Sequence, residues 1–210
     1  MHNTIKNLLD IESKINKRAK IIAVSKTFPI DKILPLIEYG HINFGENKVQ
    51  EGVEKWTEIK KMNSQIKLHM IGKLQTNKVK FAVNIFDYIH SVDNEKLAKK
   101  IANECKKLNK KIKIFIQVNI GDEEQKSGIN KNGVNQLVSY SKEIGLNVIG
   151  LMCIPPANIH TEGYFDEMNK LNQSLGFTEL SMGMSSDFHI AVRYSSTYVR
   201  VGSSIFGQRY

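Results

Sequence analysis

The feature of this sequence that most constrains its fold is a regular alternation of short apolar runs with longer amphipathic stretches. Several of the short runs are almost continuously apolar, which is typical of parallel strands that helices cover on both faces. The predicted strands span residues 21–25, 42–45, 68–72, 88–91, 114–119, 148–154, 180–184 and 198–202. The stretches between them predict helices over residues 30–39, 48–61, 77–85, 95–108, 134–144, 164–175 and 188–194. This alternation indicates an α/β fold with a parallel sheet.

Eight strand–helix units favour a closed barrel over an open sheet. An open doubly wound sheet usually has about five or six strands, whereas eight units match a (β/α)8 TIM barrel. The chain has 210 residues, which is close to the lower size limit of about 200 residues for such a barrel. We therefore expect a single domain over residues 1–210. An additional helix is predicted over residues 4–18, and we expect it to fill the ring position of a helix after the eighth strand.

An excess of positive charge makes nucleic acid a partner to consider. The chain has 30 basic and 21 acidic residues, which gives a net charge of +9. Only four of the basic residues are arginine, the side chain that base and phosphate recognition favours. No zinc-finger spacing or arginine-rich arm occurs either. We therefore interpret the lysines as a solvated surface and expect no specific nucleic-acid binding.

The sequence predicts a cytoplasmic protein without membrane spans or metal. No apolar run approaches about 18 residues, and the N-terminal segment carries Asp10 where a signal peptide would be apolar. The two cysteines, Cys105 and Cys153, stand alone in apolar segments, as reduced core cysteines do. The histidines show no paired ligand spacing, so we expect no metal site. His69 and His90 fall in predicted strands, where we expect hydrogen-bonded structural roles.

A lysine stands where the first predicted strand ends. In a barrel of this kind the chemistry lies at the carboxyl ends of the strands, and Lys26 follows the apolar run over residues 21–25. Partial burial there would disfavour the ammonium form and make the neutral amine available for Schiff-base chemistry. The alternative is a lysine whose stem is buried and whose ammonium group reaches water.

Serine and glycine gather where the seventh and eighth strands end. Ser181, Ser185, Gly202 and Ser203 lie in the positions where barrel enzymes most often hold a phosphate; the alternative is ordinary turn chemistry. Arg200 precedes Gly202 by two residues, so both should face the same side of the strand. Together, these residues predict a pocket with an amine, an inward-facing arginine and a phosphate-binding site. Such a pocket suits a phosphorylated aldehyde. Pyridoxal 5′-phosphate (PLP) and a sugar phosphate both fit this description.

Eight short segments, taken in order along the chain, resemble those of a known family. They are AVSKT (23–27), NFGENKVQE (43–51), HMIGKLQTNK (69–78), SVD (91–93), QVNIGDEEQKSGI (117–129), GLMCIPP (150–156), LSMGMSSD (180–187) and STYVRVGSSIFGQR (196–209). With these segments the chain resembles the PLP homeostasis proteins, single-domain relatives of the barrel half of alanine racemase. The resemblance implies an alanine racemase N-terminal-domain type of barrel, in which Lys26 carries PLP as an internal aldimine.

The resemblance also assigns the other site residues. It implies Asn47 near the cofactor ring, Arg200 near the pyridine nitrogen, and Ser181, Ser185, Gly202 and Ser203 around the phosphate. Without the resemblance, Asn47 also fits a helix cap. The chain departs from the family pattern at Lys48, where arginine is common, and at Ser195, where glycine is common. The first departure weakens any bidentate anion contact, and the second affects the turn into the eighth strand.

An arginine at the pyridine nitrogen favours binding over catalysis. PLP enzymes that stabilise carbanions usually place a carboxylate there, and arginine cannot accept that proton. A racemase with this arrangement would need a second base from another domain, which we do not expect in 210 residues. We therefore expect a PLP reservoir in vitamin B6 homeostasis without catalytic residues, acting as a monomer with PLP-dependent apo-enzymes as recipients. The alternatives are a small racemase or decarboxylase, a Schiff-base aldolase acting on a sugar phosphate, and a basic nucleic-acid-binding module.

Overall fold

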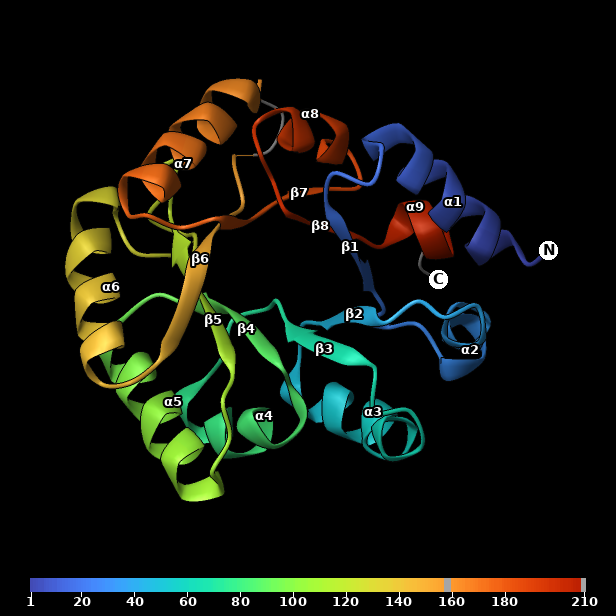
Figure 1. Ribbon diagram of the computed structural model, residues 1–210, viewed down its shortest axis with the longest axis horizontal. Helices are drawn as coiled ribbons and strands as arrows, with labels where there is room; N and C mark the ends of the chain where they lie inside the picture. The colour runs from blue at the N-terminus through green and yellow to red at the C-terminus, as the bar shows by residue number, and fades with distance from the viewer. Residues whose placement is uncertain (157–159, 209–210) are drawn as a thin grey trace.

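The computed structural model describes residues 1–156 and 160–208. Its strands are parallel and close into a barrel in sequence order, because the last strand pairs with the first. They are β1 (Lys20–Val24), β2 (Asn43–Glu46), β3 (Lys67–Met70), β4 (Tyr88–Val92), β5 (Lys113–Val118), β6 (Asn147–Cys153), β7 (Glu179–Met184) and β8 (Tyr198–Val201). Figure 1 shows the helices as a ring around these strands. The predicted (β/α)8 barrel is confirmed.

The long helices lie close to their predicted ranges, and the structure adds a one-turn helix and short 3-10 turns. They are α1 (Asn3–Ile15), α2 (Ile30–Glu38), α3 (Val49–Met62), α4 (Val79–Ile85), α5 (Glu95–Leu108), α6 (Val134–Glu143), α7 (Glu162–Ser174), α8 (Phe188–Arg193) and α9 (Ser203–Phe206). The 3-10 turns η1 (Thr76–Lys78) and η2 (Lys131–Gly133) precede α4 and α6. Helix α1 packs against α2, α8 and α9, so it fills the expected ring position beside α9 (Figure 1). The sequence analysis did not predict α9 or η2.

Asparagine residues set several helix ends. Helix α5 begins where the side chain of Asn94 accepts a hydrogen bond from the backbone N–H of Leu97, over a distance of 2.9 Å. It ends at Asn109, whose left-handed conformation (φ 48°) lets the backbone turn away, and Asn16 does the same after α1 (φ 49°). The Asn94 side chain therefore marks where α5 begins, and the left-handed backbone of Asn16 and Asn109 marks where α1 and α5 end.

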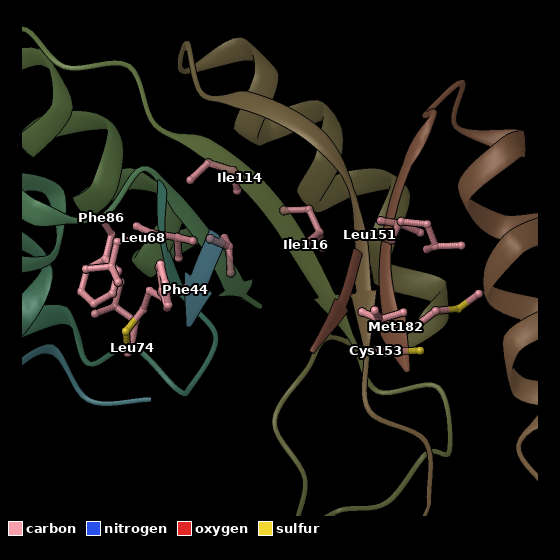
Figure 2. Packing of buried hydrophobic residues seen from close by; sticks show 14 of the residues in the cluster. Phe44, Leu68, Leu74, Phe86, Ile114, Ile116, Leu151, Cys153 and Met182 are labelled. Atoms are coloured by element: carbon pink, nitrogen blue, oxygen red, sulfur yellow. The ribbon is translucent and has the colours of Figure 1, made fainter. Parts of the chain in front are cut away.

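The core has an outer layer between strands and helices and an inner layer inside the barrel. Figure 2 shows part of the outer layer, where Ile114, Ile116, Leu151 and Cys153 project from β5 and β6. The alternate residues of the strands face inward and form a second cluster; it contains Ile22, Tyr88, Phe115, Met152 and Tyr198. The inside of the barrel is therefore packed, and open space is confined to its ends.

The two cysteines pack as the sequence predicts. Cys153 is buried and Cys105 half-buried, and both are free thiols that pack with the core, as predicted. Among the described residues, no helix combines the length and the apolar character that a membrane span requires.

Candidate functional site

A cavity of about 380 Å³ opens at the carboxyl ends of the strands. It lies between the end of β1 and the ends of β7 and β8, the part of the barrel where the sequence analysis expected the chemistry. The structure brings six of the seven predicted site residues together here. Its lining residues are Val24, Lys26, Asn47, Ile71, Ile154, Met184, Ser185, Ser186, Arg200, Gly202 and Ser203.

Lys26 reaches the cavity because a polar cluster holds the end of β1. Lys26 is half-buried and follows Ser25, which is fully buried, while Thr27 adopts a left-handed conformation (φ 65°). The hydroxyl of Ser25 donates to Oε1 of Glu46 over 2.8 Å, and the Thr27 N–H donates to Glu51. Carboxylates from β2 and α3 therefore fix the two neighbours of Lys26.

Glu46 is the centre of this cluster. Its Oε1 accepts from Nε1 of Trp56 over 2.9 Å and pairs with Nζ of Lys55 at 3.0 Å. Its other oxygen, Oε2, has no hydrogen-bond partner among the described residues. Burial raises the pKa of Glu46, and the indole and ammonium groups oppose that rise. The cluster does not line the cavity but holds the backbone before Lys26 in place. It was not predicted from the sequence because its members come from β1, β2 and α3.

A second carboxylate completes the cluster from α3. Lys55 pairs with Oε1 of Glu51 at 3.0 Å and donates to the carbonyl of Ser25 over 2.8 Å. Burial opposes ionisation of Glu51, but the Thr27 N–H and the Lys55 ammonium lower its pKa below the usual value. One ammonium therefore joins two carboxylates to the backbone that precedes Lys26.

Arg200 lies inside the barrel, under the cavity and 4% exposed. Its Nη1 donates to Oγ of Ser181 over 2.8 Å, and its Nη2 donates to the carbonyl of Cys153 over 2.9 Å. None of the ion pairs in the described part of the chain includes Arg200. Burial lowers its pKa, yet a guanidinium remains protonated in proteins. Arg200 is thus a buried cation held by neutral groups at the wall of a cavity.

The loops after β7 and β8 meet at the wall of the cavity beside the end of β1. Oγ of Ser185 accepts a hydrogen bond from the backbone N–H of Gly202 over 3.3 Å, which ties the two loops together. Gly202 packs so closely on β1 that an added Cβ would lie 3.3 Å from Cβ of Val24. Ser186 also lines the cavity and Ser203 begins α9. The serine and glycine side of the site therefore lies next to the end of β1.

Asn47 lies at the bend after β2 and does not cap the helix that follows. The N-cap residue of α3 is Lys48, which makes no side-chain capping bond. The backbone of Asn47 is pressed against Gly72, where an added Cβ would lie 2.3 Å from the Asn47 carbonyl oxygen. The helix-cap alternative for Asn47 is therefore wrong, and Gly72 fixes its position at the cavity.

Ser181 is the predicted site residue that the structure does not bring to the cavity. It lies in the middle of β7, fully buried, and its hydroxyl contacts Arg200 and Nδ1 of His90. It was expected beside Ser185 because both belong to the serine- and glycine-rich end of the seventh predicted strand. Ser181 is instead one layer deeper in the barrel, below the loop that contains Ser185.

Other expectations concern residues outside the cavity. His69 and His90 are fully buried and hydrogen-bonded inside the barrel, as predicted. Ser195 adopts a left-handed conformation (φ 67°), which explains why glycine suits the turn before β8. No group of three metal-ligating side chains occurs among the described residues. Arg209, in the segment 196–209, lies outside them.

The cavity also has an apolar wall, which was not predicted from the sequence. Val24, Ile71, Ile154 and Met184 line it, and each lies at the end of a strand or just after one. Reading every strand end for its apolar residues, as well as its polar ones, would have found them. They give the cavity an apolar floor suited to the flat face of a ring.

The closed parallel barrel has the fold of the alanine racemase N-terminal domain class. The family model for "Alanine racemase, N-terminal domain" matches residues 2–210. A relative from Aquifex aeolicus (strain VF5) is 37% identical, with 91% of this chain and 87% of the relative covered. One from Haemophilus influenzae is 38% identical, with 94% and 88% covered. Both are named pyridoxal phosphate homeostasis protein, and this chain belongs to that family.

Solved structures agree with this assignment. PipY of Synechococcus elongatus PCC7942, with PLP bound, is 32% identical with a TM-score of 0.91, over 97% of this chain and 100% of PipY. An alanine racemase of Clostridium difficile 630 has a TM-score of 0.77 at 15% identity, over 99% of this chain and 57% of the racemase. The second likeness is one of fold alone.

Proposed function

We propose that this chain binds PLP at the barrel mouth, attaches it covalently through Lys26 and serves in PLP homeostasis. The observation that carries the proposal is the cavity in which the Lys26 amine and a buried arginine share one space with two serine-rich loops. The relatives' name and the PLP bound to PipY support the same ligand.

The residues present fit this cofactor. A cavity of about 380 Å³ lies within the roughly 300–1,000 Å³ typical of small-molecule sites. Arg200 is a buried cation with two of its hydrogen bonds made to neutral groups. Burial lowers the pKa of Arg200, and the carboxylate of Asp187 opposes this shift but makes no ion pair with Arg200 among the described residues. Burying a charge without a directly paired partner is costly, so an electron-rich group placed beside Arg200 would stabilise it. The serine hydroxyls opposite are suited to phosphate oxygens.

Each side of the cavity then has a defined task. When bound, the cofactor supplies an aldehyde that condenses with an amine, forming a carbon–nitrogen double bond and releasing one water. Lys26 provides that amine, and Asn47 bounds the space for the ring. Ser185 and Ser203 donate hydrogen bonds to the phosphate, near the backbone of Gly202. Arg200 donates to the pyridine nitrogen and keeps it unprotonated, since arginine accepts no proton.

The same cavity argues against robust catalysis. A neutral pyridine nitrogen makes the ring a weak electron sink. Racemisation also requires a second acid or base, and the described residues that line the cavity include no Asp, Glu, His, Tyr or Cys. We therefore propose a cytoplasmic, single-domain monomer that stores PLP and releases it to PLP-dependent apo-enzymes. An aldolase would need the same missing acid or base.

An absorbance spectrum with chemical trapping tests the proposal. Protein purified with PLP should show a visible band that disappears on borohydride reduction, leaving a phosphopyridoxyl mass on the peptide containing Lys26. Lys26→Ala should lose the band and the mass, while Lys73→Ala, which changes a neighbouring exposed lysine, should keep both. A label on another peptide would overturn the site. Exchange of an amino acid α-proton in heavy water, dependent on Lys26, would overturn the non-catalytic role.

A further inference from the structure

A continuous row of hydrogen bonds crosses the inside of the barrel and ends at Arg200. From Arg200 it passes to Oγ of Ser181, and from there to Nδ1 of His90 over 2.9 Å. Nε2 of His90 lies 3.0 Å from Nδ1 of His69, and Nε2 of His69 lies 3.2 Å from Oδ1 of Asn43. The row therefore links β8, β7, β4, β3 and β2.

The two ends of this row determine where its hydrogens lie. Arg200 can only donate, and Oδ1 of Asn43 can only accept. Nε2 of His69 must then carry a hydrogen, which leaves its Nδ1 as an acceptor for Nε2–H of His90. Nδ1 of His90 in turn accepts the hydroxyl hydrogen of Ser181. The lone pairs of Ser181 are thereby turned toward the guanidinium of Arg200.

This assignment needs both imidazole rings to be neutral. His69 and His90 are fully buried, and burial holds the pKa of each well below its usual value. The rings are also clamped by aromatic neighbours: His69 stacks on Tyr88 with ring centres 4.2 Å apart, and His90 stacks on Phe115 at 4.3 Å. The row therefore contains two uncharged rings with one fixed orientation each.

We infer that His90, oriented by His69, is a positioning residue for Arg200: it fixes the hydroxyl of Ser181 as an acceptor and so aims the guanidinium at the cofactor ring. The role toward the cofactor rests on the proposed function, whereas the direction of the hydrogen bonds does not. Without an acceptor at the place of His90 Nδ1, the Ser181 hydroxyl is free to rotate and Arg200 loses a fixed contact.

The protein without cofactor gives the first test. The ring ¹⁵N spectrum of His69 and His90 at about pH 7 should show two neutral rings, each with its hydrogen on Nε2. A hydrogen on Nδ1 of either ring, or a positive charge on one of them, would overturn the inference. This measurement uses the unaltered chain, so it stands even if a variant fails to fold.

Three variants give the second test, read by PLP affinity and by the position of the visible band. His90→Phe keeps the stacking on Phe115 but removes the acceptor for the Ser181 hydroxyl. It should weaken PLP binding about tenfold and shift the band, because the hydrogen bond from the charged Arg200 to Ser181 is disturbed. His90→Asn places an amide oxygen near the position of Nδ1 and should restore affinity to within about threefold. The control Ser141→Ala removes a buried hydroxyl on α6, outside the row and the cavity, and should change neither quantity.

The outcomes separate this inference from the proposed function. If the unaltered protein forms no Lys26 adduct, the proposed function fails while the ¹⁵N result still stands. If it forms the adduct and a folded His90→Phe variant has the same PLP affinity and band, the positioning role is wrong. Failure of His90→Asn to recover both readouts would likewise reject the acceptor explanation.

Discussion

Replacing Gly72 by alanine tests how the cavity wall is built. Gly72 follows β3, and the methyl group of an alanine would lie 2.3 Å from the carbonyl oxygen of Asn47 and 2.8 Å from its Cα. These are backbone atoms, so no change of rotamer relieves the overlap. The chain must separate at this point, and Asn47, which lines the cavity, must move.

The structure sets the size of the expected effect. Overpacking of this kind costs about 1–3 kcal/mol. For a chain of this length each kcal/mol lowers Tm by roughly 2–4 °C, so a loss of about 2 kcal/mol corresponds to a fall of about 4–8 °C. Displacing Asn47, which bounds the space for the ring, should also loosen the fit of the bound cofactor; a loss of about 1 kcal/mol would weaken PLP binding about fivefold.

Thermal unfolding and PLP titration of Gly72→Ala measure the two effects separately. The matched control is Gly163→Ala in α7, where an added Cβ has no neighbour within 4 Å. That control should leave PLP affinity unchanged and stabilise the protein by up to about 1 kcal/mol, since alanine favours a helix. A Gly72→Ala protein with the Tm and PLP affinity of the unaltered chain would refute the packing argument.

Two further predictions concern buried ionisable side chains. Because burial lowers the pKa of His69 and His90 well below the usual value, these rings take up protons in the unfolded chain but stay neutral in the folded one. The free energy of unfolding should therefore fall as pH drops below about 6.5. The slope should reach up to about 1.4 kcal/mol per pH unit for each ring. Urea midpoints between about pH 7 and about pH 5 should show a shallower slope for His69→Gln, and equal slopes would contradict this. Lys55→Met leaves the Glu46 carboxylate buried without its ammonium, and should cost about 3–5 kcal/mol of stability. Lys61→Met breaks an exposed pair with Glu58 and should cost less than about 1 kcal/mol; equal losses would show that the Glu46 pair is unimportant.

Much of the fold follows from hydrophobic periodicity, because several strands are almost continuously apolar and the long helices are amphipathic. Helix α5 has the predicted bounds, since Asn94 and Asn109 mark its ends in the sequence. Helix α9 escaped prediction because one turn is too short to show a period. These differences are local and leave the order of strands unchanged.

The site residues that lie at the carboxyl ends of strands could be predicted from the sequence. Lys26, Asn47 and Gly202 meet because parallel strands finish at the same mouth of a barrel. The depth of Ser181 depends on the pairing of β7 with its neighbours, which includes a register shift between Ser181 and Met184. The contact of His69 with His90 depends likewise on how β3 pairs with β4. A single sequence contains no direct signal for either pairing.

Closure of the ring between β1 and β8 has a consequence for assembly of the site. Lys26 comes from just after the first strand and Gly202 from just after the last, so these two parts of the site come together only when β1 pairs with β8, from Lys20 with Tyr198 to Ala23 with Val201. A chain that is still emerging from the ribosome has the amine but no opposite wall. A ligand that spans this seam fastens the first strand to the last, and so delays unfolding that starts by opening the ring there.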